Sequence, residues 1–312
     1  CKKRYEVGDY FINLNQPSMR LVRTLMDKNI PLPSDFMREQ ERRRKRGMPV
    51  QIYDVTSWSL PLMMNLEVQD CGSLVAATSK SLAPADFETK EVAALKKADL
   101  AYLVPWGNRS SSAFLAKGLR SGLVIKSTSL PFVHNGRDYP AGSLILEVVS
   151  QEPGFFEAIS SLQEEVGADV IPVDSGWVTE GPNFGSGNVI TLKAPKIAIA
   201  WDEPANAYIA GATRFILEQE YGYPVTIIRS DRIRSSVLER YDVLILAGQQ
   251  GKGYSQIFGE RGIQDLKGWV KSGGVILSLE KATEFLAEPD VALISNKPEL
   301  AYQDETDSSK NG

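Results

Sequence analysis

The sequence contains few of the side chains on which most hydrolytic enzymes depend. It has one histidine, His134, and two cysteines, Cys1 and Cys71, among 312 residues. A Ser-His-Asp triad, a Cys-His pair and a catalytic zinc each need an imidazole beside a nucleophile or a metal. Two cysteines cannot build a disulfide framework, and no apolar run reaches the ~18 residues that a membrane-spanning helix needs. These absences exclude several classes of function before any motif is considered.

The setting of His134 also speaks against a metal site. The histidine lies in residues 132–136 (FVHNG), a pattern typical of a strand that runs into a turn. Neither an HxxE nor an HExxH spacing surrounds it. A catalytic zinc needs about three protein ligands, usually with two imidazoles among them. We therefore predict a histidine held by backbone groups, with no metal, no cofactor and no catalytic residue in this chain.

Length and charge limit the choice of architecture and partner. At 312 residues the chain exceeds one hydrophobic core, so two domains are expected. The net charge of −4 gives no reason to expect nucleic acid or an anionic membrane as a partner. A basic run at 42–46 follows Glu39 and Glu41 at helical spacing. This spacing indicates a solvated helix face, with a polyanion site as the alternative.

The chain begins with Cys1 rather than with methionine. This start favours either the boundary of a fragment or the removal of a leader. A lipid-modified first cysteine is the alternative.

The C-terminal half has the pattern of an α/β domain with a parallel sheet. Four short apolar runs stand at 197–201, 225–228, 243–247 and 275–279. Segments of helical periodicity alternate with them at 205–220, 235–240, 263–271 and 281–287. Strands that are apolar on both faces and alternate with amphipathic helices are typical of a sheet covered on both sides. We predict a flavodoxin-like, doubly wound domain over 194–290 and an irregular acidic tail over 291–312.

The N-terminal half predicts a mixed α/β accessory domain over 1–175. Residues 5–17 and 139–153 each follow the order turn, strand and Gln/Pro break, and each precedes an amphipathic helix. This suggests an internal repeat, with chance similarity of two strand–helix units as the alternative. Further strands are expected at 101–106 and 123–126, on either side of a helix at 111–120. Residues 176–193, rich in glycine and proline, are predicted to be a linker.

The end of the fourth apolar run bears on amidotransferase chemistry. In class I glutamine amidotransferase-like folds, a nucleophilic cysteine occupies the sharp turn after a strand, and a downstream histidine acts as its base. Here the run at 275–279 leads into Glu280, Lys281 and Ala282, and no histidine follows position 134. Glutaminase activity by that mechanism is excluded.

Two short segments are candidates for ligand binding. They comprise Trp201, Asp202 and Glu203 at the end of the first run, and Gly248, Gln249 and Gly251 after the third. The carboxyl ends of these two strands flank the point where ligands bind in doubly wound sheets. Two carboxylates and an indole could hold a cationic group or a sugar, and glycines could bring backbone amides to a phosphate. The alternatives are an acid pair that favours the helix dipole and a tight strand-to-helix connection.

Six segments together resemble a set of large bacterial zinc carboxypeptidase-like proteins. They are 52–61 (IYDVTSWSLP), 174–188 (DSGWVTEGPNFGSGN), 194–204 (APKIAIAWDEP), 211–215 (GATRF), 223–226 (YPVT) and 241–246 (YDVLIL). In that family an exported zinc peptidase domain precedes a long region that ends in an amidotransferase-like domain. The resemblance covers most of 1–290. The family's zinc ligands, His-x-x-Glu and a later His, and its catalytic glutamate match no position here.

The resemblance implies that this chain is the non-catalytic part of such a peptidase and ends in a degenerate amidotransferase-like domain. It would dock on the peptidase domain of the same polypeptide, which would hold the zinc, and would shape substrate access or assembly in the periplasm or outside the cell. The alternative is a module that binds a small ligand or a peptide at the candidate residues. An independent enzyme that uses Asp, Glu or Lys alone would show Asp202 and Glu203 buried together.

Overall fold

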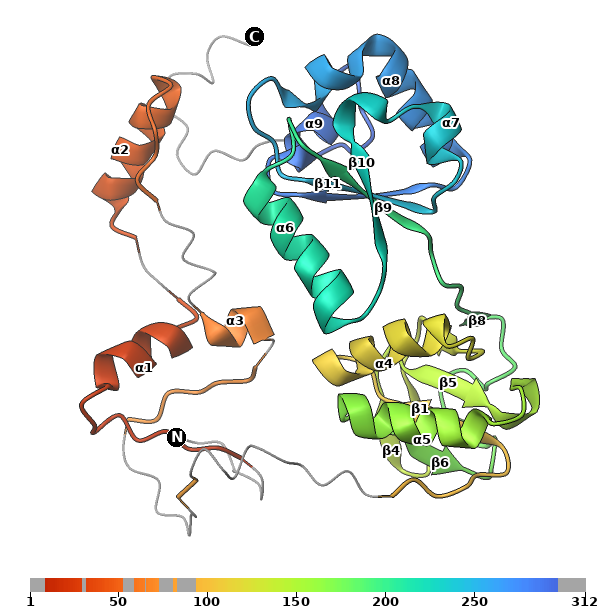
Figure 1. Ribbon diagram of the computed structural model, residues 1–312. Coiled ribbons are helices and arrows are strands. Elements are labelled where there is room, and N and C mark those ends of the chain that lie inside the picture. Colours follow the sequence, from red (N-terminus) through yellow and green to blue (C-terminus); the bar gives the residue numbers. More distant parts are fainter. Residues whose placement is uncertain are drawn as a thin grey trace, which may run out of the picture. The chain divides into compact units, whose positions relative to one another are not determined.

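The computed structural model describes residues 9–29, 32–52, 59–64, 66–72, 81–82 and 94–296, and Figure 1 shows their helices and strands. The chain divides into two compact units, one of residues 1–83 with 297–312 and the other of residues 84–296. Both helices and sheets are present, so the predicted α/β class is confirmed. In the part of the chain that is described, no helix is long and apolar enough to cross a membrane.

The described residues of the first unit form the helices α1 (Met19–Met26), α2 (Ser34–Lys45) and α3 (Leu60–Met64). Arg42 pairs with Glu39 at 3.1 Å between Nη1 and Oε2, as expected for a solvated helix face. Residues 9–13, which precede α1, form no strand, and 5–8 lie outside the described residues. The predicted repeat is therefore not confirmed. The 52–61 segment, one of the six that carry the family resemblance, also falls mostly outside the described residues.

The second unit begins with a five-stranded sheet in the order β6-β1-β5-β2-β8. Its strands are β1 (Ala101–Val104), β2 (Lys126–Thr128), β5 (Leu144–Glu147), β6 (Ile171–Val173) and β8 (Val189–Thr191), and every pairing is antiparallel. A second, three-stranded sheet has the order β4-β3-β7, with β3 (Phe132–His134), β4 (Arg137–Tyr139) and β7 (Val178–Glu180). The accompanying helices are α4 (Arg109–Arg120), α5 (Phe155–Val166) and the short turn η3 (Val148–Ser150).

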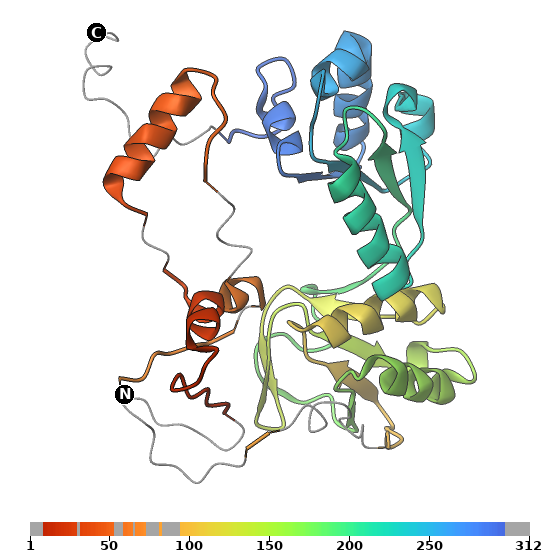
Figure 2. The same ribbon diagram turned by 60° about the vertical axis from the view of Figure 1, so that its left-hand side comes forward.

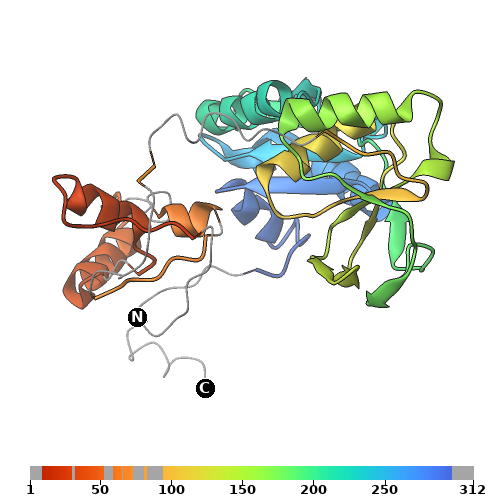
Figure 3. The ribbon, with the colours of Figure 1, turned by 90° about the horizontal axis from the view of Figure 1, so that it is seen from below.

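The interior strand β1 is buried along its whole length because the larger sheet is covered on both faces. Tyr102 and Val104 pack with residues of α4 and α5, which lie side by side over one face (Figures 1 and 3). Ala101 and Leu103, which alternate with them, pack toward the three-stranded sheet. Because side chains alternate between the two faces of a strand, β1 contributes residues to two hydrophobic cores, one on each face of the sheet.

The glycine-rich segment 176–193, predicted to be a linker, carries β7 and β8, which pair with β3 and β2. Each of these strands has only three residues, too few to show the alternation of a strand in a segment that also contains four glycines. The composition of the segment therefore indicates a loop. The backbone conformation at Gly181 explains why this position is a glycine. Its φ is 90°, and a Cβ there would lie 2.4 Å from the carbonyl oxygen of Pro131.

His134 ends β3 and is almost fully buried. Its Nε2 lies 2.7 Å from the carbonyl oxygen of Ser175. Because a carbonyl oxygen can only accept, Nε2 carries the proton in this contact. The prediction that a backbone group holds this histidine is confirmed.

The C-terminal part of the second unit contains a four-stranded parallel sheet in the order β10-β9-β11-β12 (Figure 2). Its strands are β9 (Ile197–Trp201), β10 (Val225–Arg229), β11 (Val243–Ala247) and β12 (Val275–Leu279). The helical elements are α6 (Ala207–Phe215), η4 (Ile216–Glu220), η5 (Ser230–Arg232), α7 (Ser235–Leu238), α8 (Gly253–Lys271) and α9 (Ala282–Ala287). All four predicted strands are confirmed.

This sheet is covered by helices on both faces. On one face α6 packs with Ile199 and Ile245, and on the other α7, α8 and α9 pack with Ala200 and Leu244. The predicted helix at 263–271 is the second part of α8, which begins ten residues earlier at Gly253. Gly259 has a φ of 60° inside it and kinks the helix. Gly253 and Gly259 lie in the first part of α8, and glycine disfavours helices. The sequence of this part therefore does not predict a helix.

The edge strand β12 has no fully buried residue. Val275 and Leu277 pair in register with Val243 and Ile245, so they face the same side as α6. They are nevertheless 55% and 48% exposed.

We predict that Gly274→Ala destabilises the protein. A Cβ at this position would lie 2.2 Å from Cε2 of the buried Trp269, so the ring must move. Such overpacking costs about 1–3 kcal/mol in the free energy of unfolding, measured by urea titration. Gly268→Ala in α8 is the control, because no atom lies within 4 Å of its added Cβ. Equal effects of the two substitutions would contradict the prediction.

We also expect stability to fall at alkaline pH because of Tyr254. Burial raises the pKa of Tyr254, and its hydroxyl makes no hydrogen bond of good geometry. The neutral form therefore stabilises the fold fully below the unfolded-state pKa of about 10, and this contribution is lost as pH rises toward the folded-state value.

Urea unfolding of Tyr254→Phe between pH 7 and 11 measures this contribution. The variant should be about as stable as the parent at pH 7, since it deletes a buried hydroxyl that makes no well-formed hydrogen bond, and should lose less stability at high pH. Burial also raises the pKa of three other tyrosines, so a weaker dependence remains; these are Tyr102, Tyr139 and Tyr223. Tyr208→Phe, at an 89% exposed position, is the control. Parallel pH profiles of parent and Tyr254→Phe would refute the prediction.

Candidate functional site

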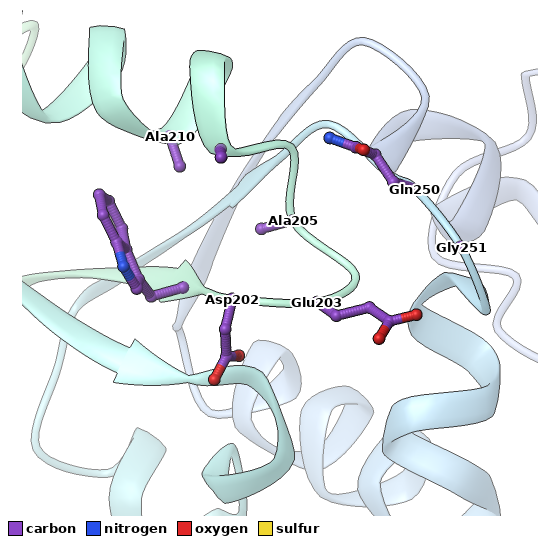
Figure 4. A pocket seen from close by; sticks show the side chains of 8 residues that line it. Asp202, Glu203, Ala205, Ala210, Gln250 and Gly251 are labelled. Atoms are coloured by element: carbon purple, nitrogen blue, oxygen red, sulfur yellow. The ribbon is translucent and has the colours of Figure 1, made fainter.

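The carboxyl ends of β9 and β11 lie next to each other in the middle of the parallel sheet. The chain leaves β9 toward β10 and leaves β11 toward β12, so the strand order reverses between them. Ligands of open α/β sheets bind in the crevice outside such a point. A pocket of about 360 Å³ lies here (Figure 4), lined by Trp201, Asp202, Glu203, Ala205, Ala207, Ala210, Gln250 and Gly251.

Three alanines and Trp201 form the apolar part of the lining, and Asn206 fixes the position of the segment that carries the alanines. The Asn206 side-chain oxygen accepts hydrogen bonds from the N–H groups of Tyr208 and Ile209, at 3.0 and 3.3 Å, and so caps α6. The Asn206 backbone N–H donates to the carbonyl of Ala247 at 2.8 Å. The start of α6 is thereby fixed against the end of β11.

Asp202 takes part in the local structure more than in the pocket. Its φ of 64° turns the chain, and Figure 4 shows its carboxylate pointing away from Ala205 and Ala210. One carboxylate oxygen lies 2.9 Å from Nε of Arg229, and the other accepts from the N–H of Ser230 at 3.1 Å. The negative charge of Asp202 is therefore balanced.

Glu203 is the carboxylate that faces the opposite loop. Figure 4 shows its side chain extending toward Gly251, and its Oε1 lies 3.5 Å from the backbone N of Lys252. Among the described residues, no lysine or arginine side chain forms an ion pair with it. Gly251 leaves room for it, since a Cβ there would lie 2.4 Å from Oε1 of Glu203.

Gly248 and Gln249 do not line the pocket, although the sequence suggested them. Gly248 is buried with a φ of 66°, and a Cβ there would lie 2.8 Å from Cβ of Asn206. The Gln249 side-chain oxygen accepts from the N–H of Tyr254 at 3.1 Å, near the start of α8. Gln250 lines the pocket instead. Its neighbour Gln249 looks the same in sequence, and only the loop conformation separates their roles.

The loop does not offer a phosphate cradle, because several of its N–H groups are already bonded. Gly248 donates to Leu279 at 3.1 Å, Gln250 donates to Pro204 at 2.7 Å and Gly253 donates to Gln250 at 3.3 Å. A neighbouring carboxylate, Glu203, would also repel an anion. The loop is better explained as a tight connection between β11 and α8.

Searches for similar proteins found no match among family models, curated proteins or solved structures.

We predict that Asn206→Ala loosens this wall of the pocket. The substitution removes the cap of α6, which costs about 1 kcal/mol in the free energy of unfolding measured with urea. Asn206→Asp keeps an oxygen in the same place and should cost much less. A loss in the aspartate variant as large as in the alanine variant would show that capping is not the cause.

Proposed function

We propose that this chain is a non-catalytic accessory region of an exported zinc carboxypeptidase-like protein, and that its C-terminal domain binds a small ligand or a peptide. The observation that carries the binding function is the pocket between the ends of β9 and β11. Its volume of about 360 Å³ lies in the range of small-molecule sites, roughly 300–1,000 Å³. Its lining combines apolar side chains with a few polar groups, as such sites do.

We propose that this domain has a flavodoxin-like fold and is a degenerate amidotransferase-like domain. A flavodoxin-like sheet has the strand order 2-1-3-4-5, with helices on both faces. The order β10-β9-β11-β12 matches the first four strands of that order, and helices cover both faces here, which supports the proposal. Glu280, with a φ of 53°, follows β12 at the turn where an amidotransferase would place its cysteine. A carboxylate cannot serve there as a thiolate nucleophile.

The accessory role rests on the resemblance of six sequence segments to zinc carboxypeptidase-like proteins. In this proposal the partner is the peptidase domain of the same polypeptide, which holds the zinc and meets the peptide substrate. The location is the periplasm or the exterior of the cell. An independent acid-based enzyme gains no support, because Asp202 and Glu203 are both exposed and Asp202 pairs with Arg229.

Two measurements on the purified chain test the accessory role. Metal analysis should find no stoichiometric zinc, and incubation with peptides should release no C-terminal residues. One tightly held zinc per chain, or chelator-sensitive cleavage, would overturn it.

A small-molecule screen by ligand-observed NMR tests the pocket. Ala207 is an exposed part of the lining, so Ala207→Trp should fill the pocket and abolish binding of the hits without unfolding α6. Ala212→Trp is the control, since Ala212 is also exposed on α6 but does not line the pocket. Absence of hits, or hits that survive Ala207→Trp, would remove the binding function.

A further inference from the structure

We infer that the pocket selects a ligand with a primary ammonium group beside an apolar body, and that Glu203 binds the ammonium. This rests on the proposed function of the pocket and names the class of ligand. The inference rests on one observation. The carboxylate of Glu203, which has no cationic partner among the described residues, lies at the edge of a lining made largely of Trp201 and three alanines.

The charges at the pocket separate its two carboxylates. Asp202 is neutralised by Arg229 and turned away from the alanines, as Figure 4 shows. Glu203 also lines the pocket, and no cationic side chain among the described residues pairs with it. Lys252 approaches Glu203 through its backbone nitrogen, at 3.5 Å. The local charge open to a ligand is therefore negative.

The polar groups at the pocket also discriminate against other ligand classes. An anion would meet the carboxylate of Glu203 and a loop in which the N–H groups of Gly248, Gln250 and Gly253 are already bonded within the protein. A sugar needs several convergent hydrogen-bonding side chains, whereas Ala205, Ala207 and Ala210 supply none. Glu203 and the amide of Gln250 are the side chains of the lining left to bind a polar head.

The apolar lining suits the rest of such a ligand. Ala205 and Ala210 are buried and small, so they leave a hollow instead of filling it. The Trp201 indole offers a face for an aliphatic or aromatic group. The N-terminal amine of a peptide with an apolar first residue and a free alkylamine share this chemistry.

Three probes of one shape test the inference on the full chain. They are 2-phenylethylamine, 2-phenylethanol and 3-phenylpropionate, which carry a positive, neutral and negative head on the same body. Their dissociation constants are measured by ligand-observed NMR at low salt. We expect the amine to bind about tenfold or more tightly than the alcohol, because a charge-assisted hydrogen bond forms only with the amine. The carboxylate should bind most weakly.

Glu203→Gln should erase the preference for the amine while the alcohol binds as before. Glu203 is exposed, so the variant should fold, and thermal unfolding checks this. Glu284→Gln makes the same chemical change at an exposed position in α9 outside the pocket and should leave the preference intact. Gly251→Ala, whose Cβ would collide with Glu203, should weaken amine binding without removing the charge.

A second pair of probes distinguishes the source of the amine. Phenylalanine amide represents a peptide N-terminus, and N-acetylphenylalanine amide is the same molecule without the charge. Tighter binding of the free amine, lost in Glu203→Gln, would extend the inference to peptide N-termini. Equal binding of this pair would restrict the site to simple alkylamines.

The outcomes separate this inference from the proposed function. Equal binding of all three phenyl probes, blocked by Ala207→Trp, would overturn the ammonium preference and leave the pocket as a ligand site. An amine preference that persists in Glu203→Gln would overturn the role of Glu203. Binding of no probe would overturn the ammonium inference, and the separate small-molecule screen then decides whether the pocket binds any ligand.

Discussion

The hydrogen bond from the Asn206 N–H to the carbonyl of Ala247 is the contact on which the candidate site depends. It joins the loop after β9 to the end of β11, two strands whose following segments run in opposite directions. It holds the capped start of α6 beside the end of β11, and the packing of α6 on Ile199 and Ile245 holds the rest of the helix. The glycine at 248 permits the close approach, because any side chain there would meet Asn206 and Ile209.

Because of this geometry, the adjacent acids Asp202 and Glu203 have different surroundings. The left-handed backbone of Asp202 sends its carboxylate toward β10, where Arg229 and the Ser230 amide receive it. The next residue, Glu203, is carried to the other side of the strand end, toward the loop after β11. Neighbours in sequence thus have different electrostatic surroundings, one balanced and one open. A pair of identical charges in the sequence need not act as a pair in space.

Much of the parallel sheet could be predicted from the sequence, because fully buried strands leave uninterrupted apolar runs. The runs at 197–201 and 243–247 match β9 and β11 residue for residue. The first part of α8 could not be predicted, since glycines that look like loop residues lie within it. The three-residue strands β7 and β8 were missed because their pairing partners, not their own pattern, define them.

Within the candidate site, the sequence could locate the strand ends but not the directions of the side chains. Trp201, Asp202, Glu203 and Gly251 line one pocket, as their places after two neighbouring strands suggested. The choice between Gln249 and Gln250 depends on backbone torsions and on the cap of α8, which composition does not reveal. The charge balance of Asp202 depends on Arg229, twenty-seven residues away in the chain.

The exposed edge strand β12 has a consequence for the behaviour of the protein in concentrated solution. From Val275 to Leu279 the strand has neither a charged residue nor a proline, the two devices that usually prevent edge-to-edge aggregation. Among the described residues no strand pairs with its outer edge, so an extended chain of another molecule could add there, beside the exposed apolar side chains of Val275 and Leu277.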